Sequence, residues 1–174
     1  MLFKLEREKI SNCVAKLQIK YCEFFKENTT KIVSLIEKEN CDVFYFDSSH
    51  EELKNDEIRG KIEQKGQENG IKKYNIFIRE NDENELQRFV LAHELGHLLL
   101  GHNGTRYFTV KKQDLSFWND DMCELEANLF AISVLMKDDL FRTAYSTTQD
   151  IKELSRIFIV PEKAVCMKID FLGL

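Results

Sequence analysis

Residues 89–100 read FVLAHELGHLLL, an apolar run interrupted by two histidines and one glutamate. The run has the length of a helix, and helical geometry places His93 and His97, four residues apart, on one face. Two imidazoles on one face can bind one Zn²⁺, and Glu94 beside them can accept a proton from a metal-bound water. Because ionisable side chains inside an apolar helix are costly without partners, the pattern favours a metal site over two core histidines.

A catalytic zinc needs a third protein ligand, and residues 123–131, CELEANLFA, offer two acids. Glu124 and Asn128 share one helix face, so Glu124 can bind the metal while Asn128 supports a ligating histidine. Glu126 points to another side of the helix and is interpreted as a solvated surface acid. We therefore predict that Glu124 is the third ligand of a His93, His97 and Glu124 set, and this set favours zinc over manganese.

Several stretches together resemble the ImmA/IrrE family of metallopeptidases, over roughly residues 43–174. They are residues 60–66, 71–78, 87–100, 124–131, 134–136, 154–165 and 172–174. The resemblance implies that His93, His97 and Glu124 are zinc ligands and that Glu94 is the general base. One departure is Lys137, which stands where the family usually has proline; it alters a helix end and not the chemistry.

The resemblance also implies a function. Members of the family are bacterial or phage proteins that typically cleave a partner helix-turn-helix repressor, which releases genes for mobile-element transfer or stress responses. We therefore expect a zinc-dependent endopeptidase that acts in transcription regulation. Its mechanism would use a zinc-bound water of pKa about 7, with Glu94 accepting the proton and returning it to the leaving amine.

Two functions other than peptide cleavage are consistent with the same sequence. A non-proteolytic, zinc-containing regulatory or toxin–antitoxin-type protein would act by binding, but it has no reason to hold Glu94 beside the metal. A second alternative is DNA binding by residues 148–170, whose pattern is similar to a helix-turn-helix. The net charge of −5 and the few lysines in that segment make nucleic acid an unfavourable partner.

An oxyanion formed during peptide cleavage needs a further hydrogen-bond donor. Tyr107 is predicted as this catalytic residue, with a packing role as the alternative. His102 is interpreted as a surface residue at a helix end. Arg88 is expected to form a structural ion pair or to bind substrate, and Cys123 could respond to oxidation or compete for the metal.

Composition suggests where the protein works. Five cysteines without a C-x-x-C pair indicate reduced thiols rather than a disulfide framework. The charged start of the chain does not match a signal peptide, and no apolar stretch approaches the roughly 20 residues of a membrane span. We expect a cytoplasmic protein with no membrane partner, and no feature of the sequence predicts an oligomeric state.

The patterns predict an α+β fold: a mostly helical, zincin-like domain with a small antiparallel sheet beside the H-E-x-x-H helix. Strands are expected at 42–46, 60–66 and 74–78, and helices at 5–39 with a break at 28–30, at 120–136, and twice after 148. Asn81 or Asp82 would cap the H-E-x-x-H helix and Gly101 would follow its end, while Asp120 and Asp121 are explained as caps of the next helix.

The predicted organisation has three parts. Residues 1–40 form an N-terminal helical segment packed on the domain, residues 41–147 the zincin-like catalytic domain, and residues 148–174 a C-terminal helical segment.

Overall fold

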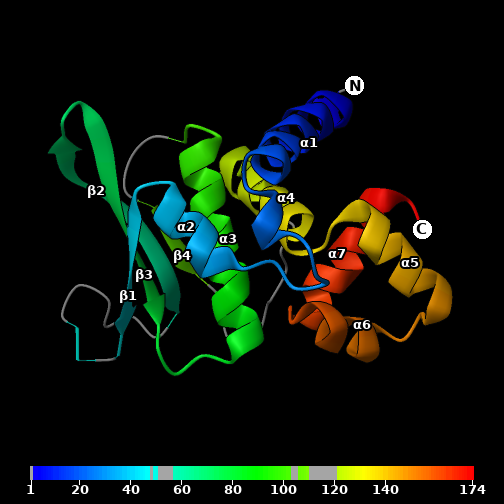
Figure 1. Cartoon of the computed structure of the whole chain (residues 1–174). Helices are drawn as coiled ribbons and strands as arrows, with labels where there is room; N and C mark the ends of the chain where they lie inside the picture. Colours follow the sequence, from blue (N-terminus) through cyan, green and yellow to red (C-terminus); the bar gives the residue numbers. More distant parts are fainter. Residues whose placement is uncertain (1, 48, 51–56, 103–105, 110–120) are drawn as a thin grey trace.

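Helices lie to one side of a small sheet in the structure, a computed structural model that describes residues 2–47, 49–50, 57–102, 106–109 and 121–174 (Figure 1). The strands are β1 (Cys41–Phe46), β2 (Ile58–Glu68), β3 (Ile71–Arg79) and β4 (Arg106–Thr109). The helices are α1 (Leu2–Lys20), the 3-10 helix η1 (Cys22–Phe24), α2 (Ile32–Lys38), α3 (Asn84–Leu99), α4 (Met122–Leu135), α5 (Asp138–Thr147), α6 (Ile151–Phe158) and α7 (Glu162–Leu172). The predicted α+β class is confirmed.

The sheet has the strand order β1-β3-β2-β4. Strands β2 and β3 form an antiparallel hairpin whose two-residue turn, Asn69-Gly70, has positive φ at both positions, as a type I′ turn requires. Strand β4 pairs antiparallel with β2, but β1 pairs parallel with β3. The sheet is therefore mixed, and the prediction of an antiparallel sheet is wrong at this edge. The reason is that β3, the returning arm of the hairpin, inserts between β1 and β2.

Helix α3 carries the H-E-x-x-H motif and lies between the sheet and α4 (Figure 1). Its residues 89–97 are all buried, and the apolar ones share a core with Ile62, Ile76 and Ile78 of the sheet. The predicted caps Asn81 and Asp82 are wrong, because the N-cap residue is Glu83. Asp82 instead accepts a hydrogen bond from Arg59 at 2.7 Å.

Helix α4 is buried along nearly its whole length and packs across α3. A Cβ atom added to Gly96 of α3 would lie 3.0 Å from Cδ1 of Phe130 and 3.3 Å from Cα of Ala127. The glycine therefore allows the two helices to approach closely. Asp121 caps α4 as predicted, because its carboxylate accepts a hydrogen bond from the backbone N–H of Cys123.

The N-terminal region is divided more than the sequence suggests. Helix α1 ends at Lys20, and α2 begins only at Ile32. Apolar residues of α1 at three- and four-residue steps, among them Ile10, Val14 and Leu17, are buried in the core, and α1 packs on α4. The hydroxyl of Thr30 donates to the carbonyl of Val134 at 2.7 Å, so the segment between α1 and α2 is hydrogen-bonded to α4.

The C-terminal region contains α5, which the sequence analysis missed, followed by α6 and α7. Pro161 is the N-cap of α7. Arg88 donates to the carbonyls of Ile159 and Thr30, both at 3.1 Å. Its role is therefore structural, as one alternative had it, but the partners that hold it are backbone carbonyls rather than an acid.

All five cysteines are free thiols. Among the helices described, none is both long and apolar enough to cross a membrane.

Candidate metal centre

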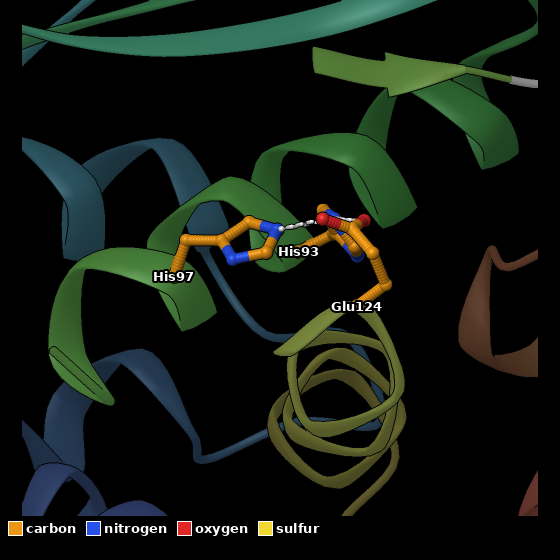
Figure 2. Close-up of side chains that lie close together, drawn as sticks. All are labelled: His93, His97 and Glu124. Carbon is orange, nitrogen blue, oxygen red and sulfur yellow. Dashed lines mark hydrogen bonds and ion pairs between the residues drawn. The ribbon is translucent and has the colours of Figure 1, made fainter. Parts of the chain in front are cut away.

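Helices α3 and α4 bring the three predicted ligands together. Figure 2 shows the imidazoles of His93 and His97, on α3, facing the carboxylate of Glu124 at the start of α4. Nε2 of His93 is 3.3 Å from one carboxylate oxygen of Glu124, and Nε2 of His97 is 3.4 Å from the other. One ligand atom from each residue lies within 4.8 Å of the other two.

The other ring nitrogen of each histidine has a partner that fixes the ring. Nδ1 of His93 lies 2.8 Å from Oδ1 of Asn128, four residues after Glu124 on α4. Nδ1 of His97 lies 2.8 Å from Nδ1 of His102. Because a carbonyl oxygen only accepts, His93 donates from Nδ1, which leaves the lone pair of Nε2 for the metal position.

These residues fit a metal ion. The two Nε2 atoms are 2.8 Å apart, whereas two nitrogens bound at about 2.1 Å to one tetrahedral zinc lie roughly 3.4 Å apart. A shift of a few tenths of an ångström therefore suffices for His93 and His97 to share an ion. Two imidazoles and a carboxylate form the ligand set of many catalytic zinc sites, which keep a fourth position open.

Glu124 is favoured in its charged form. Burial raises the pKa of its carboxyl, but hydrogen bonds and charge interactions with His93 and His97 outweigh burial, so the pKa lies well below its ordinary value. The side chain keeps 18% of its surface exposed, whereas both histidines are fully enclosed. Glu124 is therefore the one residue of these three that contacts solvent.

Glu94, the predicted general base, is completely buried and packs against strand β2. A Cβ atom added to Gly60 of β2 would lie 2.3 Å from Cγ1 of Val90 and 3.1 Å from Oε1 of Glu94. The absence of a side chain at position 60 thus makes room for the Glu94 carboxylate at the contact between the sheet and α3.

Two interpretations of the sequence are wrong. His102 is not a surface residue but is 5% exposed in its side chain, between His97 and Glu126. Glu126 is not a solvated acid: it is 7% exposed and its Oε2 lies 2.8 Å from Nε2 of His102 and 2.6 Å from Nζ of Lys9. Burial lowers the pKa of His102, although the hydrogen bond with Glu126 acts in the opposite direction.

Strand β4 lies beside the cluster, and Phe108 is a residue that the sequence analysis missed. Its ring packs edge-on against His93, with 4.6 Å between ring centroids. The backbone of Tyr107 pairs with Lys61 of β2, but the Tyr107 side chain lies outside the described residues, as does Asp120. The role of Tyr107 as an oxyanion donor therefore stays a prediction.

Comparison with known protein families gives a match that covers most of the chain. A family model described as Peptidase_M78, IrrE N-terminal-like domain, matches residues 36–170. No curated protein matches the chain.

Proposed function

This chain belongs to the Peptidase_M78 (IrrE N-terminal-like) family, and from that premise we propose that it is a zinc-dependent endopeptidase. The observation that carries the proposal is the convergence of His93, His97 and Glu124, whose ligand atoms lie within 4.8 Å of one another. Membership of the family supports a metallopeptidase type of function, and the donor set of two imidazoles and one carboxylate supports zinc.

Zinc held by His93, His97 and Glu124 would polarise a peptide carbonyl and make a bound water acidic near neutral pH. Glu94 follows the first ligand directly, and we assign it the proton transfer. Its carboxylate accepts one proton from the attacking water as the oxygen bonds to the scissile carbon. The same carboxyl then returns this proton to the departing amide nitrogen as the C–N bond breaks.

The surrounding residues contribute orientation. Asn128 and His102 contact Nδ1 of His93 and of His97, respectively, so the Nε2 atoms of both rings face the metal position. Phe108 covers one side of His93 with an apolar ring, which limits water there.

For the substrate we propose a regulatory protein such as a helix-turn-helix repressor, and for the place of action the cytoplasm. Resemblance to the ImmA/IrrE peptidases supports the repressor, and five free cysteines suit a reducing compartment. A helix-turn-helix repressor encoded next to the gene for this chain, where the genome has one, would be the first substrate to test.

The test compares wild type with Glu94→Gln for zinc content and for cleavage of that repressor. Glu94→Gln should keep about one zinc per chain and lose cleavage by several orders of magnitude, because glutamine cannot accept the proton. His93→Ala is the metal-free control and should lose both zinc and cleavage. If Glu94→Gln cuts as fast as wild type, the assignment of the general base is wrong. If wild type binds zinc but cuts no repressor, the chain is either the non-proteolytic binding protein or a peptidase that needs another substrate or an activating signal.

A further inference from the structure

A line of hydrogen bonds leads from the candidate metal centre to the N-terminal helix. It begins at Nδ1 of His97 on α3, 2.8 Å from Nδ1 of His102. Nε2 of His102 lies 2.8 Å from Oε2 of Glu126 on α4. The same oxygen of Glu126 accepts from Nζ of Lys9 on α1 at 2.6 Å. Three helices thus contribute to one connected set of side chains.

When His97 binds a metal, the donor and the acceptor of each hydrogen bond along this line are determined. The lone pair of Nε2 then faces the metal, so Nδ1 of His97 carries the ring proton and donates a hydrogen bond to Nδ1 of His102. His102 in turn carries its proton on Nε2 and donates to the carboxylate of Glu126. Every donor meets an acceptor, and both histidines stay neutral.

The backbone conformation at the end of α3 explains why His102 lies next to His97. Gly101 has a φ of +77°, and the backbone N–H of His102 donates to the carbonyl of His97 at 2.9 Å. The N–H of Gly101 donates to the carbonyl of Leu98 at 3.2 Å. These two bonds form a Schellman motif, which reverses the chain directly after the helix. The reversal places the His102 ring against the second ligand.

We propose that His102 and Glu126 are positioning residues for His97, and that Lys9 extends this support to α1. Metal affinity would then depend on a helix that lies outside residues 36–170, the segment that the family model matches. The inference rests on the metal site of the proposed function but not on any proteolytic activity.

The test measures zinc affinity by competition with a chromophoric chelator and the site geometry by the d–d absorption of bound Co²⁺. His102→Ala should weaken zinc binding roughly 10- to 100-fold, as loss of such outer partners does at other sites. His102→Asn should recover much of that loss, because its amide oxygen stands near the position of Nδ1 and can accept from His97. A role in packing alone would not be rescued in this way.

Lys9→Met tests the extension to α1. It should weaken zinc binding by a smaller factor, since Glu126 keeps its bond to His102 but loses the cation that orients it. Lys20→Met is the matched control, because Lys20 is on the same helix and pairs with Glu39 at 2.9 Å, away from the metal centre. Its zinc affinity should equal that of wild type.

The outcomes separate this inference from the proposed function. Wild-type zinc affinity and an unchanged Co²⁺ spectrum in His102→Ala would overturn the positioning role. Equal affinities in Lys9→Met and Lys20→Met would overturn the link to α1. If wild type itself binds no zinc, the proposed function fails instead. Should His102→Ala not fold, the comparison of His102→Asn with wild type decides, since a large loss without rescue contradicts the proposal.

Discussion

Gly60 shows how one residue without a side chain can set the position of a catalytic group. The closest atoms to a Cβ added there belong to Val90, at 2.3 Å, and Glu94, at 3.1 Å. We expect Gly60→Ala to lower the free energy of unfolding by about 1–3 kcal/mol, as overpacking does, and to reduce cleavage by displacing the Glu94 carboxylate. Chemical denaturation and a cleavage assay at saturating zinc check the two effects.

The control for Gly60→Ala is Gly66→Ala on the same strand, where an added Cβ meets nothing within 4 Å. A second variant, Gly60→Ala with Val90→Ala, removes the closer contact and should recover part of the stability while cleavage stays low. If Gly60→Ala matches Gly66→Ala in both measurements, Gly60 does not position Glu94.

At the level of residues, the sequence predicts contacts within one helix far better than contacts across a chain reversal. His93 and His97 are placed by the helical repeat alone, and Asn128 follows Glu124 by the same rule. The pairing of His102 with Glu126 depends on the left-handed Gly101 and on where two helices cross. The spacing of His102 behind the motif is a usable signal, but without knowledge of the reversal the sequence favours a surface position.

The crossing of α3 and α4 determines the candidate centre, because α3 supplies two of its residues and α4 the third. Gly96→Ala should force these helices apart, since the backbone of Ala127, 3.3 Å from the added Cβ, cannot rotate away. We expect a loss of about 1–3 kcal/mol in unfolding free energy. Zinc affinity should fall with it, because Glu124 moves away from His93 and His97.

The contrary result for Gly96→Ala would be a loss of stability with unchanged zinc affinity. The helices would then adjust without changing the distances in the cluster. Gly66→Ala again serves as the control for both measurements.

At the level of elements, long apolar helices and the β2–β3 hairpin follow from local patterns. Helix α5 does not, because threonines weaken its intrinsic helix preference and Phe141 is its only buried residue among those described. Leu140, Ala144 and Tyr145 of α5 pack, partly buried, against the core. Parallel pairing of β1 with β3 also escapes local patterns, since it joins strands separated by the whole of β2.

Across the whole molecule, Lys168 stands out as a fully buried cation that links α7 to α5. Its Nζ lies 2.6 Å from Oδ1 of Asp138, whose side chain is 59% exposed. Removing the lysine leaves an acid that water can solvate, whereas keeping it requires burying a charge. We therefore expect Lys168→Met to leave the free energy of unfolding unchanged or to raise it, by at most about 4 kcal/mol. A loss of more than about 1 kcal/mol would contradict this account.

The effect of Lys168 should also depend on pH. Burial lowers the pKa of Lys168 below its ordinary value of 10.5, while Asp138 partly opposes the shift. Between the pKa in the folded chain and 10.5, the unfolded chain binds more protons, so raising the pH through this window stabilises the folded state. The advantage of Lys168→Met over wild type should therefore shrink as the pH rises toward 10.5. Thermal unfolding at several pH values measures it, and an advantage that grows would show the opposite linkage.

X-ray absorption of the zinc-loaded protein is the most direct test of the His93, His97 and Glu124 ligand set, because it reports the atoms bound to the metal. We predict two imidazole nitrogens with the remaining ligands oxygen, all at about 2.0–2.2 Å, and a loss of oxygen scattering in Glu124→Ala. A sulfur ligand at about 2.3 Å would implicate Cys123 instead of Glu124 and contradict the claim. So would fewer than two imidazoles.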